Sequence, residues 1–323
     1  MIPVLLIFIP LITGLLAFFI KGANGSKQLA LASSIATLAV ILLAVCNVVP
    51  PSNFSHDVSW LPSLGSRFAV SLDGMSKMLT LLTAVSFPII FAATYNNHYK
   101  NTNHFYALML LTQAGLMGVF VAADCLLFYF FWELALIPVY FLCSIWGGEK
   151  RIAVTFKFFI YTFIGSLLML VGILFLYFKT PEHSFAIKNI YALQLTAKEQ
   201  GLAFWLFFIA FAIKMPIFPF HTWQPDAYEQ SPTAVTMVLS GIMVKMGIFA
   251  VIRWLIPVFP DATHQFGFLI IVLSVVGMIY ASLIAIQQDD MKRLIAYSSI
   301  AHIGLMSAAI FAMNTIGLKG VMI

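Results

Sequence analysis

The sequence predicts an all-α fold, a polytopic transmembrane helical bundle with about ten to eleven spans. Of the 323 residues, 62% are hydrophobic and only 9% are charged, whereas a soluble domain has about 25% charged residues. Apolar runs of about 20 residues recur from end to end, and each is long enough to cross the hydrocarbon core of a bilayer. No linker or low-complexity tract divides these runs, which predicts a single transmembrane domain over residues 1–323.

The expected spans follow one another with short connections. We place them at about 2–20, 28–49, 74–95, 105–122, 125–146, 152–178, 201–230, 233–257, 266–286 and 291–313, with a further span beginning near 315. The segment 50–73 mixes Pro, Gly and alternating apolar residues, a pattern typical of an external loop with a short hairpin. A second polar loop is expected at 179–200.

The charge pattern predicts that the N-terminus lies outside the membrane. No basic segment precedes the first apolar run, while Lys21 and Lys27 follow it. That order is wrong for a cleavable signal peptide and is typical of a first span. In this orientation the short inner loops carry a slight excess of Lys and Arg. The net charge of +5 therefore reflects membrane orientation, and we expect no nucleic-acid partner.

The expected span at 201–230 contains the most unusual local sequence. It begins as an apolar helix, reaches Lys214, and continues through Pro216 and Pro219 to His221. Proline lacks a backbone N–H and clashes with the preceding turn, so two prolines predict a break in this helix. A broken helix and a charge are both costly in a bilayer, and together they are typical of a transport path.

Four ionisable residues fall well inside the expected spans: Glu133, Lys214, Lys245 and His302. Glu133 lies about 12 Å below the start of its span at a rise of about 1.5 Å per residue, and the other three lie at similar depth. Side chains so deep do not reach water by snorkelling, unlike Lys157 and Lys179 near their span ends. The pattern predicts a row of titratable groups parallel to the membrane plane, although a histidine also suits ordinary packing.

Such a row suits proton transfer. Burial favours the neutral form of a lysine, and a nearby carboxylate restores the charged form. A Glu133–Lys214 pair would hold a proton when closed and release it when open, and Lys245 and His302 would then pass it on through water. The broken helix would supply a hinge, exposed carbonyls and room for water. The alternative is a structural scaffold in which these charges only pair helices.

Redox chemistry has little support in this sequence. It has no histidine spacing typical of haem, no cysteine cluster and no glycine-rich nucleotide loop. The cysteines, Cys46, Cys125 and Cys143, lie in or beside apolar spans and are predicted to be buried free thiols. We therefore expect no cofactor and no metal on this chain. Nothing specific indicates a quinone-binding catalytic subunit.

Three stretches carry a resemblance to a known family: FWELALIPVYFL, KMPIFPFHTWQPDAYEQSPTAVTMVLSGIMVK and QQDDMKRLIAYSSIAHIG. Together they resemble the antiporter-like, proton-translocating subunits of respiratory complex I (NADH–quinone oxidoreductase). The match runs from about residue 70 to 313, and WELALIPVYFL and LIAYSSIAHIG are most similar to the chain M members, the counterparts of mitochondrial subunit 4. Subunits of the related multi-subunit cation/proton antiporters share the same lysines and remain the alternative.

The resemblance implies an antiporter-like fold with two inverted half-repeats and a broken seventh helix. It also implies proton translocation coupled to quinone reduction in other subunits, so flavin, iron–sulfur clusters and quinone are expected in those partners. Glu133 matches the glutamate that modulates the pump lysine, and Lys214 matches that lysine. Lys245 matches the connecting lysine, and His302 matches the histidine of the central polar axis.

The resemblance further implies partners and a location. The expected partners are the other membrane-arm subunits of complex I, including neighbouring antiporter-like subunits, in the lipid bilayer of a bacterial inner membrane. The family's second broken helix and its terminal acidic residue would lie beyond Ile323. We therefore expect the chain to be truncated at its C-terminus, to lack the outward half-channel and not to pump as it stands.

Overall fold

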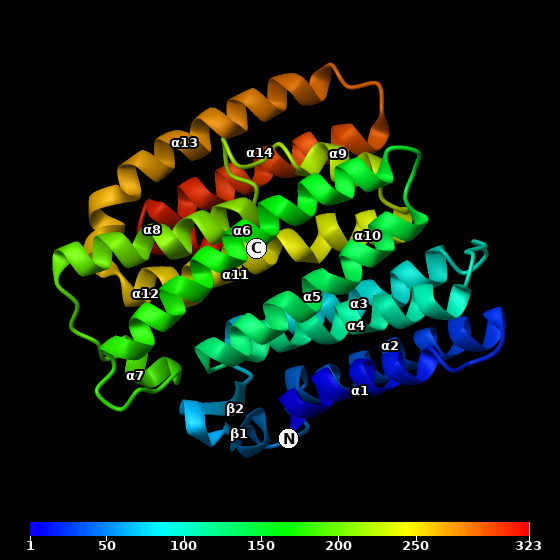
Figure 1. The fold of residues 1–323 in the computed structure, drawn as a ribbon, viewed down its shortest axis with the longest axis horizontal. Helices are drawn as coiled ribbons and strands as arrows, with labels where there is room; N and C mark the ends of the chain where they lie inside the picture. The colour runs from blue at the N-terminus through cyan, green and yellow to red at the C-terminus, as the bar shows by residue number, and fades with distance from the viewer. Residues whose placement is uncertain (323) are drawn as a thin grey trace. The chain divides into compact units, whose positions relative to one another are not determined.

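The computed structural model describes residues 1–322 and is mostly helical (Figure 1). Within these residues, eight helices are long and apolar enough to cross a membrane by length and composition: α2 (Ala23–Val45), α3 (Gly74–Ala93), α4 (Thr102–Val121), α5 (Cys125–Trp146), α6 (Arg151–Lys179), the run Thr233–Val258, α13 (Pro260–Ile286) and α14 (Met291–Phe311). The shorter helices α1 (Ile2–Ala17) and α15 (Thr315–Met322) stand at the two ends of the chain. The predicted all-α, multi-span class is confirmed.

The chain forms two compact units, which we describe one at a time. The first unit comprises Met1–Arg151, Pro181–Asn189 and Ser231–Ile242, and the second comprises Ile152–Thr180, Ile190–Gln230 and Met243–Ile323. The expected single-domain organisation remains a prediction. The elements expected beyond Ile323 lie outside the described residues.

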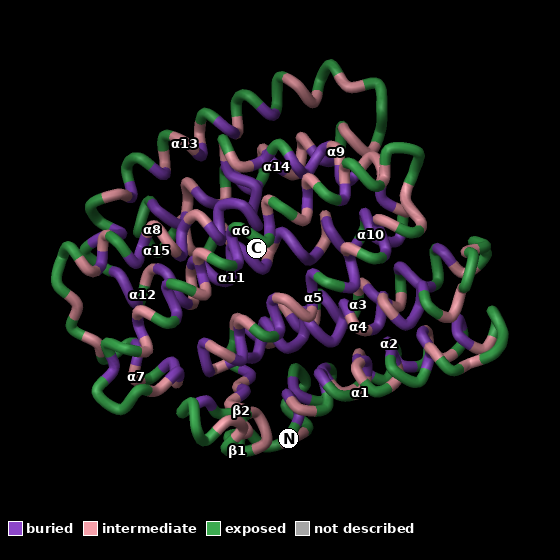
Figure 2. Tube along the Cα trace, viewed as in Figure 1, coloured by how far each residue is buried: buried purple, intermediate pink, exposed green. Residues whose placement is uncertain are grey.

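Helix α4 is the central helix of the first unit. It contacts α1, α2, α3 and α5, and Figure 2 shows it as an almost continuous buried segment. A helix surrounded by other helices requires apolar or small side chains on every face. Its glycines permit the closest approach: an added Cβ would overlap the backbone of Ala135 at Gly115 and the ring of Phe131 at Gly118. Small residues thus bring α4 and α5 together, as in other membrane bundles.

The predicted hairpin is confirmed, and its location outside the membrane remains a prediction. Strands β1 (Ser55–Leu61) and β2 (Ser66–Ser71) pair antiparallel. Between them, Gly65 adopts φ +67, a left-handed conformation that glycine tolerates best. The hairpin is fastened at Asp124, whose carboxylate accepts hydrogen bonds from the Ser66 hydroxyl at 3.0 Å and the Arg67 N–H at 3.1 Å.

The same carboxylate caps the N-terminus of α5. Asp124 accepts hydrogen bonds from the N–H groups of Leu126 and Leu127, each at 3.0 Å, which satisfies donors that have no partner inside the helix. Burial raises the pKa of the Asp124 carboxyl, and the hydrogen bonds from Leu127, Arg67, Ser66 and Leu126 act in the opposite direction. One buried side chain therefore fixes both the hairpin and the start of α5.

In the second unit, α13 lies along α14, which also contacts α9 (Gln224–Gln230). The two long helices approach closely at Gly304, where an added Cβ would lie 2.7 Å from the carbonyl oxygen of Ser274. Helix α13 alternates between buried and exposed positions along its length (Figure 2). Its exposed residues are mostly large and apolar, including Phe268, Leu283 and Ile286, as expected for a face in contact with lipid.

The run Thr233–Val258 is not a regular α-helix. It contains α10 (Thr233–Val238), α11 (Val244–Ala250) and α12 (Ile256–Val258), separated by π-helical segments at Leu239–Met243 and Val251–Leu255. Such widened turns are rare and frequently occur at functional sites. The first segment ends two residues before Lys245 and contains the boundary between the two units.

Two local details differ from the expectations. Cys125 and Cys143 are buried free thiols as predicted, but Cys46 is exposed, so that prediction is wrong for it. The reason is its position as the C-cap of α2, where the chain leaves the packed helices. The loop 179–200 also contains the short helix α7 (Ile187–Tyr191).

Gly115→Ala tests the close packing of α4 on α5. The added methyl would overlap backbone atoms of Ala135, which move only if a whole helix shifts. We expect a loss of about 1–3 kcal/mol of stability, as for other overpacked cores, measured by thermal unfolding in mild detergent. Gly74→Ala is the matched control, because no atom lies within 4 Å of its added Cβ. Equal melting of the two variants would contradict the packing argument.

Candidate functional site

The predicted break in the seventh span is confirmed. Helix α8 (Ala197–Lys214) starts at a capping box formed by Thr196 and Glu199 and ends at Lys214. Residues 215–223 form turns, and α9 resumes the span at Gln224. Pro216 and Pro219 lie in this interval and have no N–H to continue the helical pattern.

At the break, one backbone carbonyl loses its helical hydrogen bond and accepts one from a side chain instead. The N–H of Ile217 bonds to the carbonyl of Ala212 at 3.0 Å, so the carbonyl of Ile213 loses its usual helical donor. The indole N–H of Trp223 donates to that carbonyl at 3.0 Å. Trp223 is itself buried and packs against Phe158 of α6, with ring centroids 4.9 Å apart. Trp223 was not among the site residues predicted from the sequence.

Lys214 lies at the core of the second unit, with only 2% of its surface exposed. Helix α11 approaches the end of α8 just beside it, because an added Cβ at Gly247 would lie 2.7 Å from the Cβ of Met215. Lys245 is two residues before Gly247 and is half-buried. The structure therefore brings the chain segments that carry Lys214 and Lys245 together.

His221 lies within the break, seven residues after Lys214, and is also buried, with 4% exposure. Its ring stacks on Phe218 at 5.7 Å and meets the edge of Tyr280 of α13 at 5.3 Å. Phe218 in turn packs against Gly277, whose added Cβ would lie 3.0 Å from the Cβ of Phe218. The break is thus a packed structure held by α13.

Glu133 lies on α5 in the first unit and is half-buried. Pro138 follows on the same helix and cannot donate to the carbonyl of Leu134, which weakens the helical hydrogen bonding next to Glu133. Since Glu133 and Lys214 belong to different units, their pairing remains a prediction.

His302 lies on α14, and its side chain is exposed in the described structure. The helix is positioned against α9 one turn earlier, where the Gln224 amide donates to the Ser299 hydroxyl at 3.4 Å. The structure therefore places His302 in the second unit together with both lysines but at its surface. Its part in the predicted row remains a prediction.

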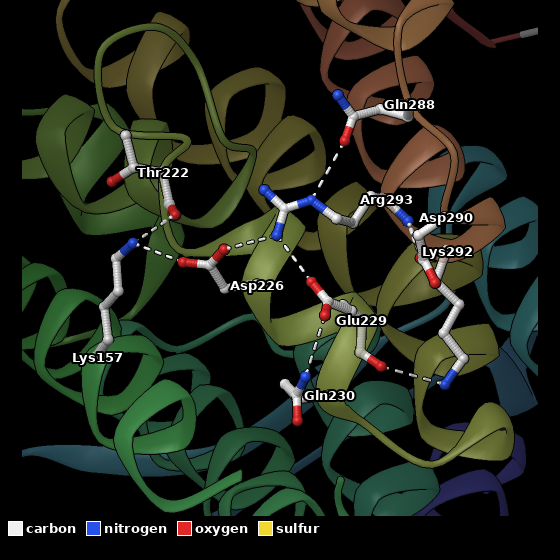
Figure 3. Close-up of polar contacts among 9 residues, drawn as sticks. All are labelled: Lys157, Thr222, Asp226, Glu229, Gln230, Gln288, Asp290, Lys292 and Arg293. Carbon is white, nitrogen blue, oxygen red and sulfur yellow. Dashed lines mark hydrogen bonds and ion pairs between the residues drawn. The ribbon is translucent and has the colours of Figure 1, made fainter. Parts of the chain in front are cut away.

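A cluster of four charged side chains, here called the Asp226 cluster, joins α6, α9 and α14 (Figure 3). Lys157 of α6 contacts Asp226 at 2.8 Å, and Arg293 of α14 contacts Asp226 at 3.2 Å and Glu229 at 2.7 Å. Lys157 also donates to the carbonyl of Thr222 at 2.9 Å. Each of the four side chains is about one third exposed; that Lys157 reaches the edge of the membrane core remains a prediction.

The Asp226 cluster was not predicted, because Lys157 and Arg293 lie 69 and 67 residues from Asp226 in the sequence. Exposed ion pairs contribute only about 0.2–1 kcal/mol each, so the main effect of the cluster is to fix how α9 lies against α6 and α14. Within residues 1–322, no three His, Cys, Asp or Glu side chains come together in a way that could hold a metal ion.

Comparison with known proteins gives a consistent result. A family model described as the transmembrane region of NADH:quinone oxidoreductase/Mrp antiporter matches residues 122–323. The chain is 38% identical over 324 residues to NADH-quinone oxidoreductase subunit M of Rickettsia prowazekii (strain Madrid E), covering 97% of this chain and 66% of that protein. It is 37% identical over 338 residues to F(420)H(2) dehydrogenase subunit M of Methanosarcina mazei, covering 100% of this chain and 68% of that protein.

The fold has solved relatives as well. A chain of respiratory complex I from Thermus thermophilus with bound NADH superposes with a TM-score of 0.88 at 27% sequence identity. The alignment covers 100% of this chain and 67% of that one. The chain thus spans about two thirds of the length of the relatives it matches.

Trp223→Phe tests the closure of the helix break. The substitution keeps an aromatic ring packed on Phe158 and removes the N–H that donates to the carbonyl of Ile213. A buried carbonyl without a donor costs about 1–3 kcal/mol, so we expect a lower melting temperature in mild detergent. Trp60→Phe is the control, since no hydrogen bond within residues 1–322 uses that indole N–H. The closure has no energetic role if both variants melt like the unsubstituted protein.

Proposed function

The chain belongs to the NADH:quinone oxidoreductase/Mrp antiporter transmembrane family, and we propose that it is a proton-translocating, chain M-type subunit of an NADH–quinone oxidoreductase. The named relatives and the complex I structure support this reading. Because the chain spans 66% of the length of the first relative, the activity is proposed for the assembled complex.

The observation that carries the proposal is the position of Lys214. A lysine with 2% exposure ends a helix at a two-proline break, and the segment bearing Lys245 packs directly on that end. An ionisable group inside a membrane is expensive to maintain unless it serves transport. Irregular backbone in a membrane also occurs where it lines an ion path. The buried charge and the irregular backbone occur together at Lys214.

In the proposed mechanism, Lys214 is the central proton carrier. Glu133 modulates it: with the carboxylate near, the ammonium is stabilised, and with the carboxylate away, the proton leaves. Lys245 accepts the proton across the α8–α11 contact by way of water. His302 then passes the proton on from the surface of the second unit, a role suited to imidazole because it titrates near neutral pH. His221, Pro216 and Pro219 keep the break in place.

Coupling comes from other subunits in this proposal. Quinone reduction, with its flavin and iron–sulfur clusters, takes place in partner subunits, and this chain carries no redox centre. The partners are membrane-arm subunits, including further antiporter-like ones, in a bacterial inner membrane. The N-terminus lies outside.

A second candidate is a subunit of a multi-subunit cation/proton antiporter, because the family description includes both classes. The two candidates share the lysines and differ in their companions. Isolation of the native chain in mild detergent separates them. Co-purifying redox subunits support the oxidoreductase, and a set of small antiporter subunits without redox centres supports the exchanger.

Lys214→Ala in the intact complex tests the proton-carrier role. We expect assembly to persist while proton pumping coupled to NADH–quinone turnover falls at least about tenfold, since a positioned proton carrier is typically worth more than that. The matched control is Lys188→Ala, an exposed lysine of α7. Measurements in proteoliposomes with a pH-sensitive dye compare the two. Normal pumping by an assembled Lys214→Ala complex would refute the proposal.

The native thiol at Cys46 tests the orientation. Cys46 is exposed at the end of α2, whereas Cys125 and Cys143 are buried. With the N-terminus outside, α2 ends outside, so a membrane-impermeant maleimide should label this chain in intact cells. The label should disappear in Cys46→Ser and return in Cys46→Ser/Ser52→Cys. Labelling only in inverted vesicles would reverse the proposed orientation.

A further inference from the structure

A groove opens between the first turns of α8 and α13 in the second unit. Its volume is about 450 Å³, within the usual range for small-molecule sites of about 300–1,000 Å³. The residues that shape it are Lys198, Gly201, Leu202, Trp205, Gln265 and Phe266. It is separate from the helix break and from the Asp226 cluster, which involve later residues of the same span and other helices.

The floor of the groove is apolar and aromatic. The rings of Trp205 and Phe266 lie with centroids 5.1 Å apart, and Leu202 is 61% exposed beside them. The space over Gly201 is open, because an added Cβ there would meet nothing closer than the Phe266 ring at 3.8 Å. An acyl chain suits this surface, since it removes apolar area from water.

The rim of the groove carries hydrogen-bond donors. The Lys198 ammonium, the Trp205 indole N–H and the Gln265 amide make no hydrogen bond to another group within residues 1–322. The neighbouring carboxylates are already engaged: Glu199 pairs with Lys179 at 2.5 Å, and Asp261 accepts from the Gln200 amide at 2.9 Å. Lys198 is therefore the cation available at the rim, which favours an anionic, acceptor-rich group.

The depth of these groups matches the layers of a bilayer leaflet. Helices α8 and α13 both begin near the groove, so their first turns lie at the same membrane face. Lys198 lies in the first turn of α8, and Trp205 lies about 10 Å deeper at about 1.5 Å per residue. The cation lies outermost, the tryptophan lies near the interface, and the apolar surface lies below. This order matches the headgroup, glycerol and acyl chain of a phospholipid.

From this arrangement we infer that the groove binds one anionic phospholipid, with its phosphate at Lys198 and Gln265 and the start of an acyl chain along Leu202, Trp205 and Phe266. Binding combines a headgroup charge contact with apolar burial, and neither component alone accounts for the lining. The site fixes a lipid at the junction of the broken span with α13 and goes beyond the proton relay. Its test does not depend on pumping.

The test uses the intact complex in lipid nanodiscs containing a trace of phosphatidylglycerol that bears a photoactivatable group near the start of one acyl chain. Cross-linked peptides are mapped by mass spectrometry after illumination. We expect labelling concentrated in residues 197–205 and 260–268, displaced by unlabelled phosphatidylglycerol and much less by phosphatidylcholine. One surface cation at a membrane is worth about fivefold in lipid binding, so the headgroup preference should be at least about that large.

Two substitutions separate the components of the site. Lys198→Glu reverses the rim charge and should lower site labelling at least about fivefold. Gly201→Leu fills the groove without changing charge and should also lower site labelling, because the acyl chain loses its apolar surface. Lys188→Glu makes the same charge change outside the groove and should leave labelling unchanged. Lys198→Gln replaces Lys198→Glu if that variant fails to assemble.

Five results would overturn the inference. Equal labelling by phosphatidylcholine, or even labelling along the exposed face of α13, would mean ordinary annular lipid. Displacement by inorganic phosphate would mean an anion site and not a lipid site. Cross-links from these residues to another polypeptide would mean that protein covers the groove. Unchanged labelling in both Lys198→Glu and Gly201→Leu would mean that the lining does not select the lipid.

Discussion

Inside a membrane, a backbone carbonyl that loses its helical donor has to find another within the protein, and the hydrogen bond from Trp223 to Ile213 meets that requirement here. Without it, the two-proline break would expose an unsatisfied carbonyl beside a buried lysine. With it, the interruption becomes a defined structure. The close contact of Gly247 with Met215 and the stacking of His221 on Phe218 both depend on that defined geometry.

Charged groups in the second unit fall into two environments with different consequences. Lys214 is buried in the core of the second unit, with 2% of its surface exposed. The Asp226 cluster is about one third exposed and pairs its charges internally, so it gives little stability and mainly positions α9. The hydrogen bond from Gln224 to Ser299 adds a second tie between α9 and α14. The second half of the broken span is thereby held from both neighbouring helices.

Much of the fold could be predicted because its causes are local. Runs of apolar residues set the spans, so the predicted 125–146 matches α5 (Cys125–Trp146). Pro216 and Pro219 predicted the break in the helix, and the turn residues of segment 50–73 predicted the hairpin. Helix faces could not be predicted in the same way, because a span that is apolar on every side has no informative periodicity. Whether His302 and Cys46 are exposed depends on which other helices pack against them. The sequence around each residue does not show this.

The contacts that complete the candidate site were harder to predict for a related reason. Trp223 and Ile213 lie 10 residues apart, Arg293 and Asp226 lie 67 apart, and Asp124 and Arg67 lie 57 apart. Each contact pairs groups that look ordinary in their own stretch of sequence. HTWQP reads as a turn, and Asp226 and Glu229 read as solvated charges. These residues gain a structural role only when the folded chain brings them into contact with their distant partners.

The anchorage of α5 has a mechanical consequence. Asp124 holds the first turn of the helix and the edge of the hairpin with four hydrogen bonds, and Gly115 and Gly118 press α4 against the same helix. Helix α5 cannot slide along its axis without breaking these bonds or driving its backbone into α4. Glu133, nine residues along from Asp124 and so about 13 Å deeper, is therefore held at one level. Rotation about the side-chain bonds of Glu133 can then move its carboxylate while the helix stays in place.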